Sequence, residues 1–259
     1  MPELPEVESL RRQLEPRLAG RRIQAVEAPD SPRFHDLGLA VGRRIAGIDR
    51  RGKFLFLRLG DRDLLIHLGL TGWLCLGPAD RRPPHVRAEW LLDGGERLYF
   101  EDPRRLGRLY MVPAGKLPAS ETLRRLGPEP LDPRFTVDYL ASRIAGMMAP
   151  AKALLLDQAI AAGVGNIYSD EALFRARVHP ARRRLSTSEA AAIHAAIQEV
   201  MRESLAAGGI ETGTFVPRVH RRGGKPCPEC GMPVASRRIA GRTAYFCPRC
   251  QPADYANSP

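Results

Sequence analysis

The segment RRIAGIDRRGKFLFLRLG, residues 43–60, reads as two β-strands joined by a turn at Arg51-Gly52. A period of two extends from Arg22 to about Val112, as in strands that bury one face. Within it, HVRAEWLLDGGERLYFED (85–102) predicts a hairpin that turns at Asp93-Gly94-Gly95. Several short strands separated by turn signals predict a β-sandwich or a barrel.

A helix is expected before these strands. Leucine and valine recur at helical spacing from Leu4 to Leu18, and Gly20 is placed to stop the helix. Pro16 lies inside the pattern and is expected to shorten or kink the helix, because proline removes one backbone hydrogen bond.

Helices are also expected after the strands. The segment LGPEPLDPRF (126–135) contains three prolines and is the predicted linker. Helical patterns follow at 136–145, 151–161 and 165–175. A longer helix is predicted from near Ser186, where Ser186 and Glu189 have capping-box spacing.

Charge and hydropathy restrict the class of protein. The 259 residues carry a formal net charge of +11, which favours a polyanionic partner such as nucleic acid. A solvated, arginine-rich surface is the alternative interpretation. No apolar run approaches the roughly 20 residues that span a bilayer, and the first twenty residues lack the pattern of a signal peptide. We therefore expect a cytoplasmic protein without a membrane partner.

The cysteines predict a metal site. Cys227 and Cys230 form one C-x-x-C pair, Cys247 and Cys250 form a second, and sixteen residues separate the pairs. Two such knuckles on a short hairpin suit one structural Zn²⁺, and four thiolate ligands leave no position for a catalytic water. Iron is a less favoured alternative. Cys75 stands apart and is expected to be a small buried apolar residue.

The first eight residues, MPELPEVE, allow two interpretations. Removal of Met1 would leave Pro2 as a secondary amine with a pKa of roughly 8, able to attack an electrophilic carbon. Glu3 and Glu6 would then lie close enough to carry protons. Alternatively, the segment is an ordinary helix start, with proline in the first turn and glutamates complementing the dipole.

The order of the motifs is specific for one family. MPELPEVE is followed by RRGKFLFL (50–57), HLGLTG (67–72), DPRRLG (102–107), LLLDQAIAAGVGNIYSDEALF (154–174) and the four cysteines. Together they resemble the formamidopyrimidine-DNA glycosylase / endonuclease VIII family of base-excision repair enzymes, over essentially the whole chain.

The resemblance implies an α+β fold in three parts. These are an N-terminal β-sandwich with an N-terminal helix (1–130), a helical domain with a helix–two-turn–helix (131–222), and a zinc-finger hairpin (223–259). Its partner would be duplex DNA that contains damaged bases or abasic (AP) sites, and its cofactor one structural zinc ion. No feature indicates oligomerisation, so a monomer is expected.

The resemblance also implies a bifunctional DNA glycosylase/AP lyase. Pro2 would attack C1′ of the sugar and form a Schiff base, and β,δ-elimination would then cut the strand. Glu3 would donate and accept protons, with Glu6 in support. Lys53 and Arg242 would contact phosphates near the lesion and donate protons during β- and δ-elimination, respectively.

Five further residues match the DNA-binding positions of the family. Asn166 in GVGNIY matches a phosphate ligand, and His67 begins the HLGLTG motif. Leu70, Arg104 and Leu106 match the residues that fill the space left by a flipped base.

Departures from the family pattern leave the lesion preference open. The purine-lesion branch usually has methionine at position 70 and phenylalanine at position 106. Ala159 replaces a lysine of that branch, and the stretch 211–227 is short for a loop that closes over 8-oxoguanine. Oxidised purines are favoured, with an endonuclease VIII-like preference for oxidised pyrimidines as the alternative. A non-catalytic zinc-dependent DNA-binding protein and an RNA-associated zinc ribbon are more distant alternatives.

Overall fold

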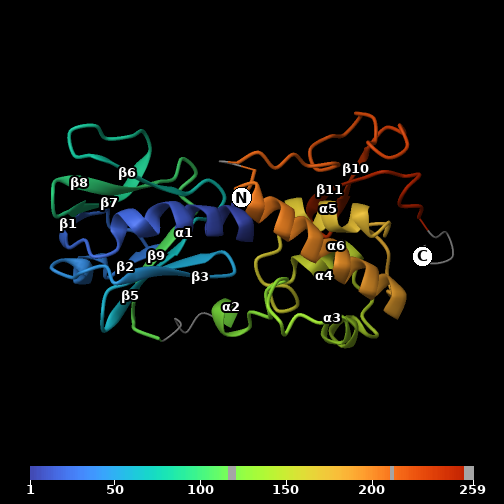
Figure 1. The fold of residues 1–259 in the computed structure, drawn as a ribbon, viewed down its shortest axis with the longest axis horizontal. Helices are drawn as coiled ribbons and strands as arrows, with labels where there is room; N and C mark the ends of the chain where they lie inside the picture. Colours follow the sequence, from blue (N-terminus) through green and yellow to red (C-terminus); the bar gives the residue numbers. More distant parts are fainter. Residues whose placement is uncertain (116–120, 211–212, 254–259) are drawn as a thin grey trace. The chain divides into compact units, whose positions relative to one another are not determined.

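The chain forms two compact units, Met1–Arg124 and Arg125–Pro259 (Figure 1). The computed structural model describes residues 1–115, 121–210 and 213–253. Residues 211–212 of the short stretch and 254–259 of the expected zinc finger therefore lie outside the described residues. The predicted division at 130 and 222 stays a prediction, and each unit is considered by itself.

Two sheets form most of the first unit. One has four strands in the order β1-β7-β8-β6, and the other has five in the order β2-β9-β5-β4-β3. All their strand pairs are antiparallel except β2 with β9. The strands are β1 (Ile23–Glu27), β2 (Phe34–His35), β3 (Gly47–Arg51), β4 (Phe54–Arg58), β5 (Arg62–His67), β6 (Trp73–Pro78), β7 (Val86–Leu92), β8 (Glu96–Glu101) and β9 (Arg108–Pro113).

A shared core joins both sheets to the first helix, α1 (Leu4–Leu18). Val7 and Leu10 of α1 pack in one apolar cluster with Leu57 of the five-stranded sheet and Trp90 of the four-stranded sheet. All four side chains are 0–1% exposed, so their burial excludes water from the sandwich. A 3-10 helix, η1 (Leu37–Ala40), completes this core. The predicted β-sandwich with an N-terminal helix is confirmed.

Pro16 neither shortens nor ends α1. The helix continues to Leu18, and the amide N–H of Ala19 still donates to the carbonyl of Glu15. Proline removes only its own N–H, so one missing bond in the last turns is tolerated where Leu14 and Leu18 remain buried. Gly20, with φ of +86°, follows the cap residue as predicted.

Three short helices, one helix of 20 residues and one hairpin form the described part of the second unit. The capping box from Ser186 to Glu189 is present at the start of α6, as predicted. The elements are α3 (Val137–Ile144), α4 (Ala151–Leu156), α5 (Asn166–Arg175), α6 (Thr187–Ala206), β10 (Ala235–Ile239) and β11 (Arg242–Phe246); α2 (Glu121–Arg124) ends the first unit.

The proline-rich segment 126–135 is packed rather than free. The amide N–H of Gly127 donates to the carbonyl of Gln158, and the amide N–H of Ala162 donates to the carbonyl of Pro128. Phe135 is 1% exposed. The segment follows directly on the boundary between the units but belongs to the core of the second.

The helix predicted over 151–161 is wrong in its second half. The α4 helix ends at Leu156, because Asp157 adopts extended backbone angles and its carboxylate accepts the amide N–H of Ala159. The side chain of Gln158 then donates to the carbonyl of Val164 and accepts the amide N–H of Gly163. These side-chain hydrogen bonds replace the helical ones and hold residues 157–165 as turns between α4 and α5.

Candidate active site and metal centre

The start of α1 brings three of the predicted site residues together. Glu3 is the cap residue of the helix, and Glu3 and Glu6 form a reciprocal capping box. The amide N–H of Glu3 donates to Oε2 of Glu6 at 2.9 Å. Pro2 is buried beside them, and both glutamates are only 1% exposed. The arrangement holds two carboxylates next to Pro2 in a fixed backbone conformation.

Lys53 follows the tight turn between β3 and β4. Gly52 has φ of +57°, a conformation that glycine adopts without strain. Lys53 is 8% exposed, so most of its side chain is covered. The predicted lysine is thus held close to the apolar core rather than on an extended surface loop.

An ion pair that sequence reasoning missed connects this turn to α1. Arg50 donates through Nη1 to the carbonyl of Gly52 at 3.0 Å and through Nε to Oε2 of Glu8 at 3.1 Å. Glu8 lies on the helix that begins at Pro2 and Glu3. Apart from their opposite charges, nothing in the sequence indicates that Arg50 and Glu8 form a pair, because they are far apart in the chain.

Glu8 stays negatively charged in spite of its burial. Burial alone would raise its pKa, but hydrogen bonds from Arg11, Arg12 and Arg50 more than offset that effect and lower the pKa to about 2. The carboxylate therefore serves as a fixed anchor for three guanidinium groups.

The positive charge of Lys53 contributes to a lowered pKa of His67. Lys53 directly precedes β4, whose first residue, Phe54, pairs with His67 of β5; the ring centroids of Phe54 and His67 are 4.7 Å apart. Burial, and the charges of Lys53 and Arg108, lower the pKa of His67 to about 4. His67 is therefore neutral at pH 7, and its Nδ1 accepts the amide N–H of Gly69 at 3.2 Å.

Two loops present the residues predicted to fill the space of a flipped base. Leu70 lies in the turn that follows His67, while Arg104 and Leu106 lie in the loop between β8 and β9. Arg104 is exposed and both leucines are partly exposed, so the three side chains are available for contact. The structure places these residues in two neighbouring loops.

A cavity of about 570 Å³ opens next to these loops in the first unit. Its wall is mainly apolar, with three basic or imidazole side chains among aliphatic and aromatic ones. It is lined by Met1, Arg33, Phe54, Leu65, His67, Gly69, Leu70, Leu106, Arg108, Tyr110 and Leu123.

In the second unit, a hydrogen bond connects Asn166 to Thr243, the residue that follows Arg242. Asn166 is the first residue of α5, after Gly165 as the cap residue. Its Nδ2 donates to the carbonyl of Thr243 at 3.1 Å, directly after Arg242. Arg242 is exposed at the start of β11, after the turn at Ala240-Gly241. A helix start near an exposed arginine suits a phosphate group.

Lys152 was missed by sequence reasoning. It is 0% exposed, donates through Nζ to the same carbonyl of Thr243 at 3.1 Å, and forms an ion pair with Asp170. Asp170 also accepts a hydrogen bond from Nδ1 of His220 at 2.8 Å. The sequence feature that could have identified it is a single lysine within the apolar segment AKALLL, because a lysine is buried only when its charge is paired. This network fastens the hairpin to α5.

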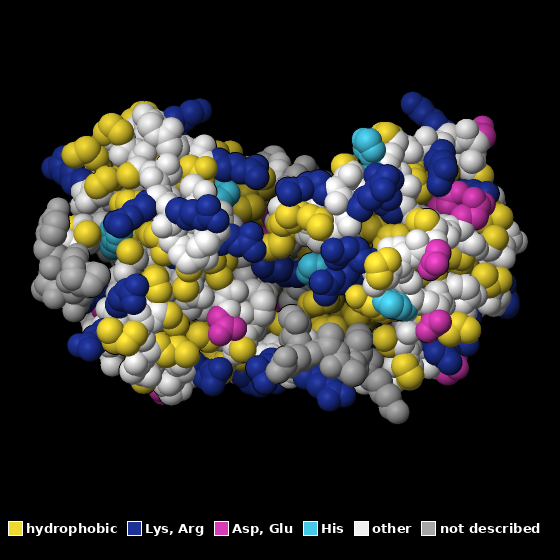
Figure 2. Space-filling view, turned by 180° about the vertical axis from the view of Figure 1, so that it is seen from behind, with side chains coloured by type: hydrophobic (Ala, Val, Ile, Leu, Met, Phe, Trp, Pro, Cys, Tyr) yellow, Lys and Arg dark blue, Asp and Glu magenta, His cyan; other side chains and the backbone are white. Residues whose placement is uncertain are grey.

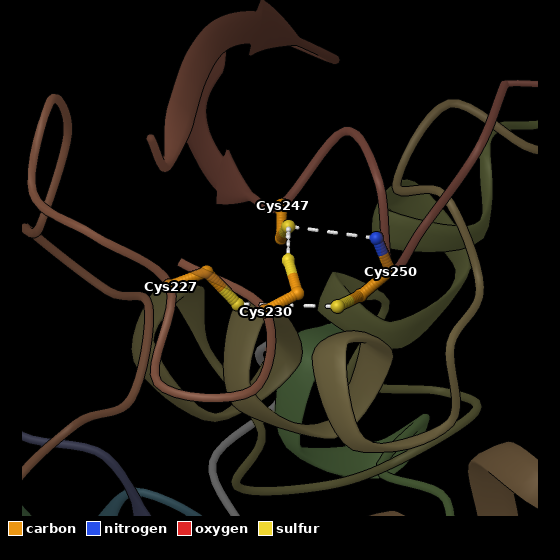
Figure 3. Close-up of side chains that lie close together, drawn as sticks. All are labelled: Cys227, Cys230, Cys247 and Cys250. Atoms are coloured by element: carbon orange, nitrogen blue, oxygen red, sulfur yellow. Dashed lines mark hydrogen bonds between the residues drawn. The ribbon is translucent and has the colours of Figure 1, made fainter. Parts of the chain in front are cut away.

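The four cysteines of the two C-x-x-C pairs converge (Figure 3). Their Sγ atoms all lie within 4.8 Å of one another. The amide N–H of Cys250 also points to Sγ of Cys247 at 3.4 Å, as in cysteine knuckles. Four thiolates in this arrangement fit one structural zinc ion and leave no open ligand position.

The metal centre is built into the second unit. Gln251 is 0% exposed; its Oε1 accepts the amide N–H of Cys247, and its Nε2 donates to the carbonyl of Val178. Cys227 and Cys247 pack with Phe174 of α5 in one apolar cluster. The zinc site therefore sets the position of the hairpin that carries Arg242.

Cys75 differs from the expectation of a small buried apolar residue. It is half-buried, and its thiol donates to Oε1 of Glu101 at 3.0 Å on the neighbouring strand. Burial and the carboxylate raise its pKa to about 12, so the sulfur is an inert thiol and not a nucleophile.

Charge on the surface agrees with a polyanionic partner. On the face shown in Figure 2, Lys and Arg side chains predominate over Asp and Glu side chains on each unit. Among the described residues, no helix is long and apolar enough to cross a membrane.

Three family models match the chain in succession. The formamidopyrimidine-DNA glycosylase N-terminal domain matches residues 1–109, and the formamidopyrimidine-DNA glycosylase H2TH domain matches residues 126–216. A zinc finger found in FPG and IleRS matches residues 224–253.

Full-length relatives carry the same family name. The chain is 46% identical over 268 residues to the formamidopyrimidine-DNA glycosylase of Thermus thermophilus, covering 97% of this chain and 98% of the relative. It is 39% identical over 279 residues to that of Deinococcus radiodurans, with coverage of 97% and 98%.

Solved structures are similar over the same length. The crystal structure of the MutM (Fpg) protein from Thermus thermophilus has a TM-score of 0.89 and 44% identity, covering 98% of this chain and 100% of that chain. The Lactococcus lactis glycosylase, non-covalently bound to DNA that contains an AP site, has a TM-score of 0.90 and 32% identity, with coverage of 97% and 100%.

Proposed function

The chain belongs to the formamidopyrimidine-DNA glycosylase family, and we propose that it excises oxidised bases from duplex DNA and then cuts the strand at the AP site. The observation that carries the proposal is the buried Pro2 held beside Glu3 and Glu6 at the start of α1. Matching relatives over nearly the whole length support the same reaction.

Pro2 is the proposed nucleophile, once Met1 has been removed. Its secondary amine attacks C1′ of the damaged nucleotide, the base leaves, and a Schiff base forms between Pro2 and the sugar. Glu3 is the proposed proton carrier at the sugar, because it is adjacent to Pro2 and its backbone is held by Glu6. Elimination at the two phosphates then opens the strand.

Lys53 and Arg242 are the proposed proton donors of the two elimination steps and contacts to phosphates. Lys53 is supported by its position after the β3–β4 turn, and Arg242 by its exposure beside the start of α5. Asn166 is a proposed phosphate ligand, and His67, Leu70, Arg104 and Leu106 are proposed DNA contacts. A helix start and fixed cations supply the attraction that a phosphate backbone requires.

The proposed substrates are formamidopyrimidine and 8-oxoguanine lesions. Structures of related proteins contain such DNA: a MutM complex with carbocyclic 8-oxo-G and a Lactococcus lactis complex with FAPY-dG both match this chain. Ala159 and the short stretch 211–227 favour the second candidate, an endonuclease VIII-like preference for oxidised pyrimidines.

Borohydride trapping tests the chemistry. The protein should become covalently attached to duplex DNA that carries an AP site when borohydride reduces the Schiff base. One extra residue before Pro2 should abolish trapping and strand cleavage while leaving DNA affinity largely unchanged. The same extension at the C-terminus is the control. Full cleavage by the N-terminally extended protein would exclude Pro2 as the nucleophile.

One duplex series separates the two lesion classes. Cleavage of duplexes carrying 8-oxoguanine, formamidopyrimidine and dihydrouracil should be faster for the two purine lesions. A higher rate on dihydrouracil would favour the endonuclease VIII-like alternative. Trapping on the AP site in the same preparation shows that the enzyme is active in either case.

A further inference from the structure

The two loops that carry Leu70, Arg104 and Leu106, here called the wedge, are in direct backbone contact. A Cβ atom on Gly69 would lie 2.6 Å from the carbonyl carbon of Leu106 and 2.7 Å from the amide nitrogen of Gly107. Gly69 also has φ of +67°. Only glycine fits both the conformation and the space, so the loops approach as closely as two backbones can.

The hydroxyl of Thr71 bridges these loops. Its Oγ1 donates to Oδ1 of Asp102 at 2.6 Å and accepts the amide N–H of Arg104 at 3.2 Å. A hydroxyl has one proton to donate and two lone pairs, so both bonds can form together. The bridge thus connects the turn that carries Leu70 to the backbone of Arg104.

Asp102 anchors the other end of the same network. It is 1% exposed, and its second carboxylate oxygen accepts the amide N–H of Gly107, next to Leu106, at 2.6 Å. Its carbonyl accepts Nε of Arg87 at 2.9 Å, and its amide N–H donates to the carbonyl of His85 at 3.1 Å. The backbone that carries this carboxylate is therefore tied to the start of β7, in the four-stranded sheet.

We propose that Thr71 and Asp102 are positioning residues, which hold the wedge as one preformed unit for insertion into DNA. This inference rests on the proposed function. A loop that must be ordered during binding spends part of the interaction free energy on that ordering. With the hydroxyl bridge in place, Leu70, Arg104 and Leu106 keep one arrangement before and after contact with the duplex.

Thr71→Val is the test, because valine keeps the shape of threonine and removes only the hydroxyl. Thr71→Ser restores the hydroxyl, and Thr187→Val, on the exposed start of α6, is the matched control. Thermal melting of each variant checks that it is folded. The probe is 2-aminopurine placed opposite an AP site, where its fluorescence reports displacement of the orphan base by the wedge.

The Thr71→Val protein should show a rate of 2-aminopurine displacement lowered about tenfold, because the buried carboxylate of Asp102 loses one hydrogen bond and the amide N–H of Arg104 loses its acceptor. Thr71→Ser and Thr187→Val should match the wild type. Borohydride trapping by Thr71→Val on an AP site opposite a tetrahydrofuran residue, which offers no base to displace, should remain at the wild-type level.

Equal displacement rates in Thr71→Val and the wild type would overturn the inference while leaving the proposed function intact. An equal loss of displacement and of trapping opposite tetrahydrofuran would also overturn it, because the hydroxyl would then support the site in general. Failure of the wild type to be trapped on any AP site would instead overturn the proposed function, and this inference with it.

Discussion

At the scale of single residues, burial and then neighbouring charge lower the pKa of His67 and keep its imidazole neutral. His67 lies next to Lys53 and Arg108, and both cations oppose a further positive charge on the imidazole. Neutral His67 can accept the amide N–H of Gly69, which begins the turn leading to Leu70. The protonation state of the His67 ring is thus linked to the geometry of the loop that carries Leu70, a proposed DNA contact.

We predict that the imidazole of His67 titrates with a midpoint near 4 in an NMR titration, instead of its ordinary value of 6.5. Because the folded pKa is lowered, protonation between pH 6.5 and 4 opposes folding. Lys53→Met should raise the midpoint by about half a unit or more, since a nearby like charge is removed. Lys225→Met, in the other unit, is the control. A midpoint unaffected by Lys53→Met would show that the charge of Lys53 does not act on His67.

At the scale of elements, one ion pair joins α1 to the β3–β4 turn. Glu8 receives hydrogen bonds from Arg11 and Arg12 on its own helix and from Arg50 on β3. Arg50 in turn holds the carbonyl before Lys53. The helix α1, which follows Pro2 and Glu3, and the turn that ends at Lys53 are therefore fixed to each other by a charge network.

Acidification should reveal this pair. The folded pKa of Glu8 is about 2, below its ordinary 4.5, so its contribution is complete above pH 4.5 and is lost as the pH falls towards 2. Glu8→Gln should lower the free energy of unfolding at pH 7 by on the order of 2 kcal/mol and flatten its dependence over that range. The control is Glu15→Gln, which removes an exposed partner of Arg11. Parallel curves for Glu8→Gln and wild type in urea unfolding from pH 6 to 3 would refute this role.

Element type was predictable where one pattern dominates, and less so where side chains compete with the backbone. The hairpin of β7 and β8 and the cap at Ser186 follow local rules and were both predicted correctly. The end of α4 was not, because Asp157 and Gln158 replace helical hydrogen bonds with side-chain ones. The sequence alone does not show whether an Asp inside a helical pattern continues the helix or ends it by accepting a backbone N–H through its side chain.

The site was predictable only in part for the same reason. Pro2, Glu3 and the four cysteines lie in short contiguous motifs, so they can be identified from the sequence alone. Lys152 and Asp102 act through partners distant in the chain, and only the packed structure shows those partners. Burial of a charged side chain is a tertiary property that composition does not report.

At the scale of the whole molecule, the net charge of +11 predicts affinity that depends strongly on salt. Arg242→Ala should weaken binding to AP-site DNA by about 1–3 kcal/mol and reduce the slope of log K against log salt by about one. Fluorescence anisotropy between 50 and 200 mM salt, roughly, measures both quantities.

Arg134→Ala is the matched control, because it removes the same charge from a side chain already paired with Asp132. Its affinity and salt slope should remain close to the wild type. An unchanged slope in Arg242→Ala would remove this arginine from the set of phosphate contacts.

The cysteine cluster makes the protein sensitive to the same oxidants that damage DNA bases. Thiolates are oxidised in steps, and Cys230 and Cys250 are only partly covered. Oxidation of either sulfur removes a ligand, and the hairpin that presents Thr243 to Asn166 and Lys152 then loses its support. The oxidising conditions that create 8-oxoguanine therefore threaten the position of Arg242, the proposed phosphate contact on this hairpin.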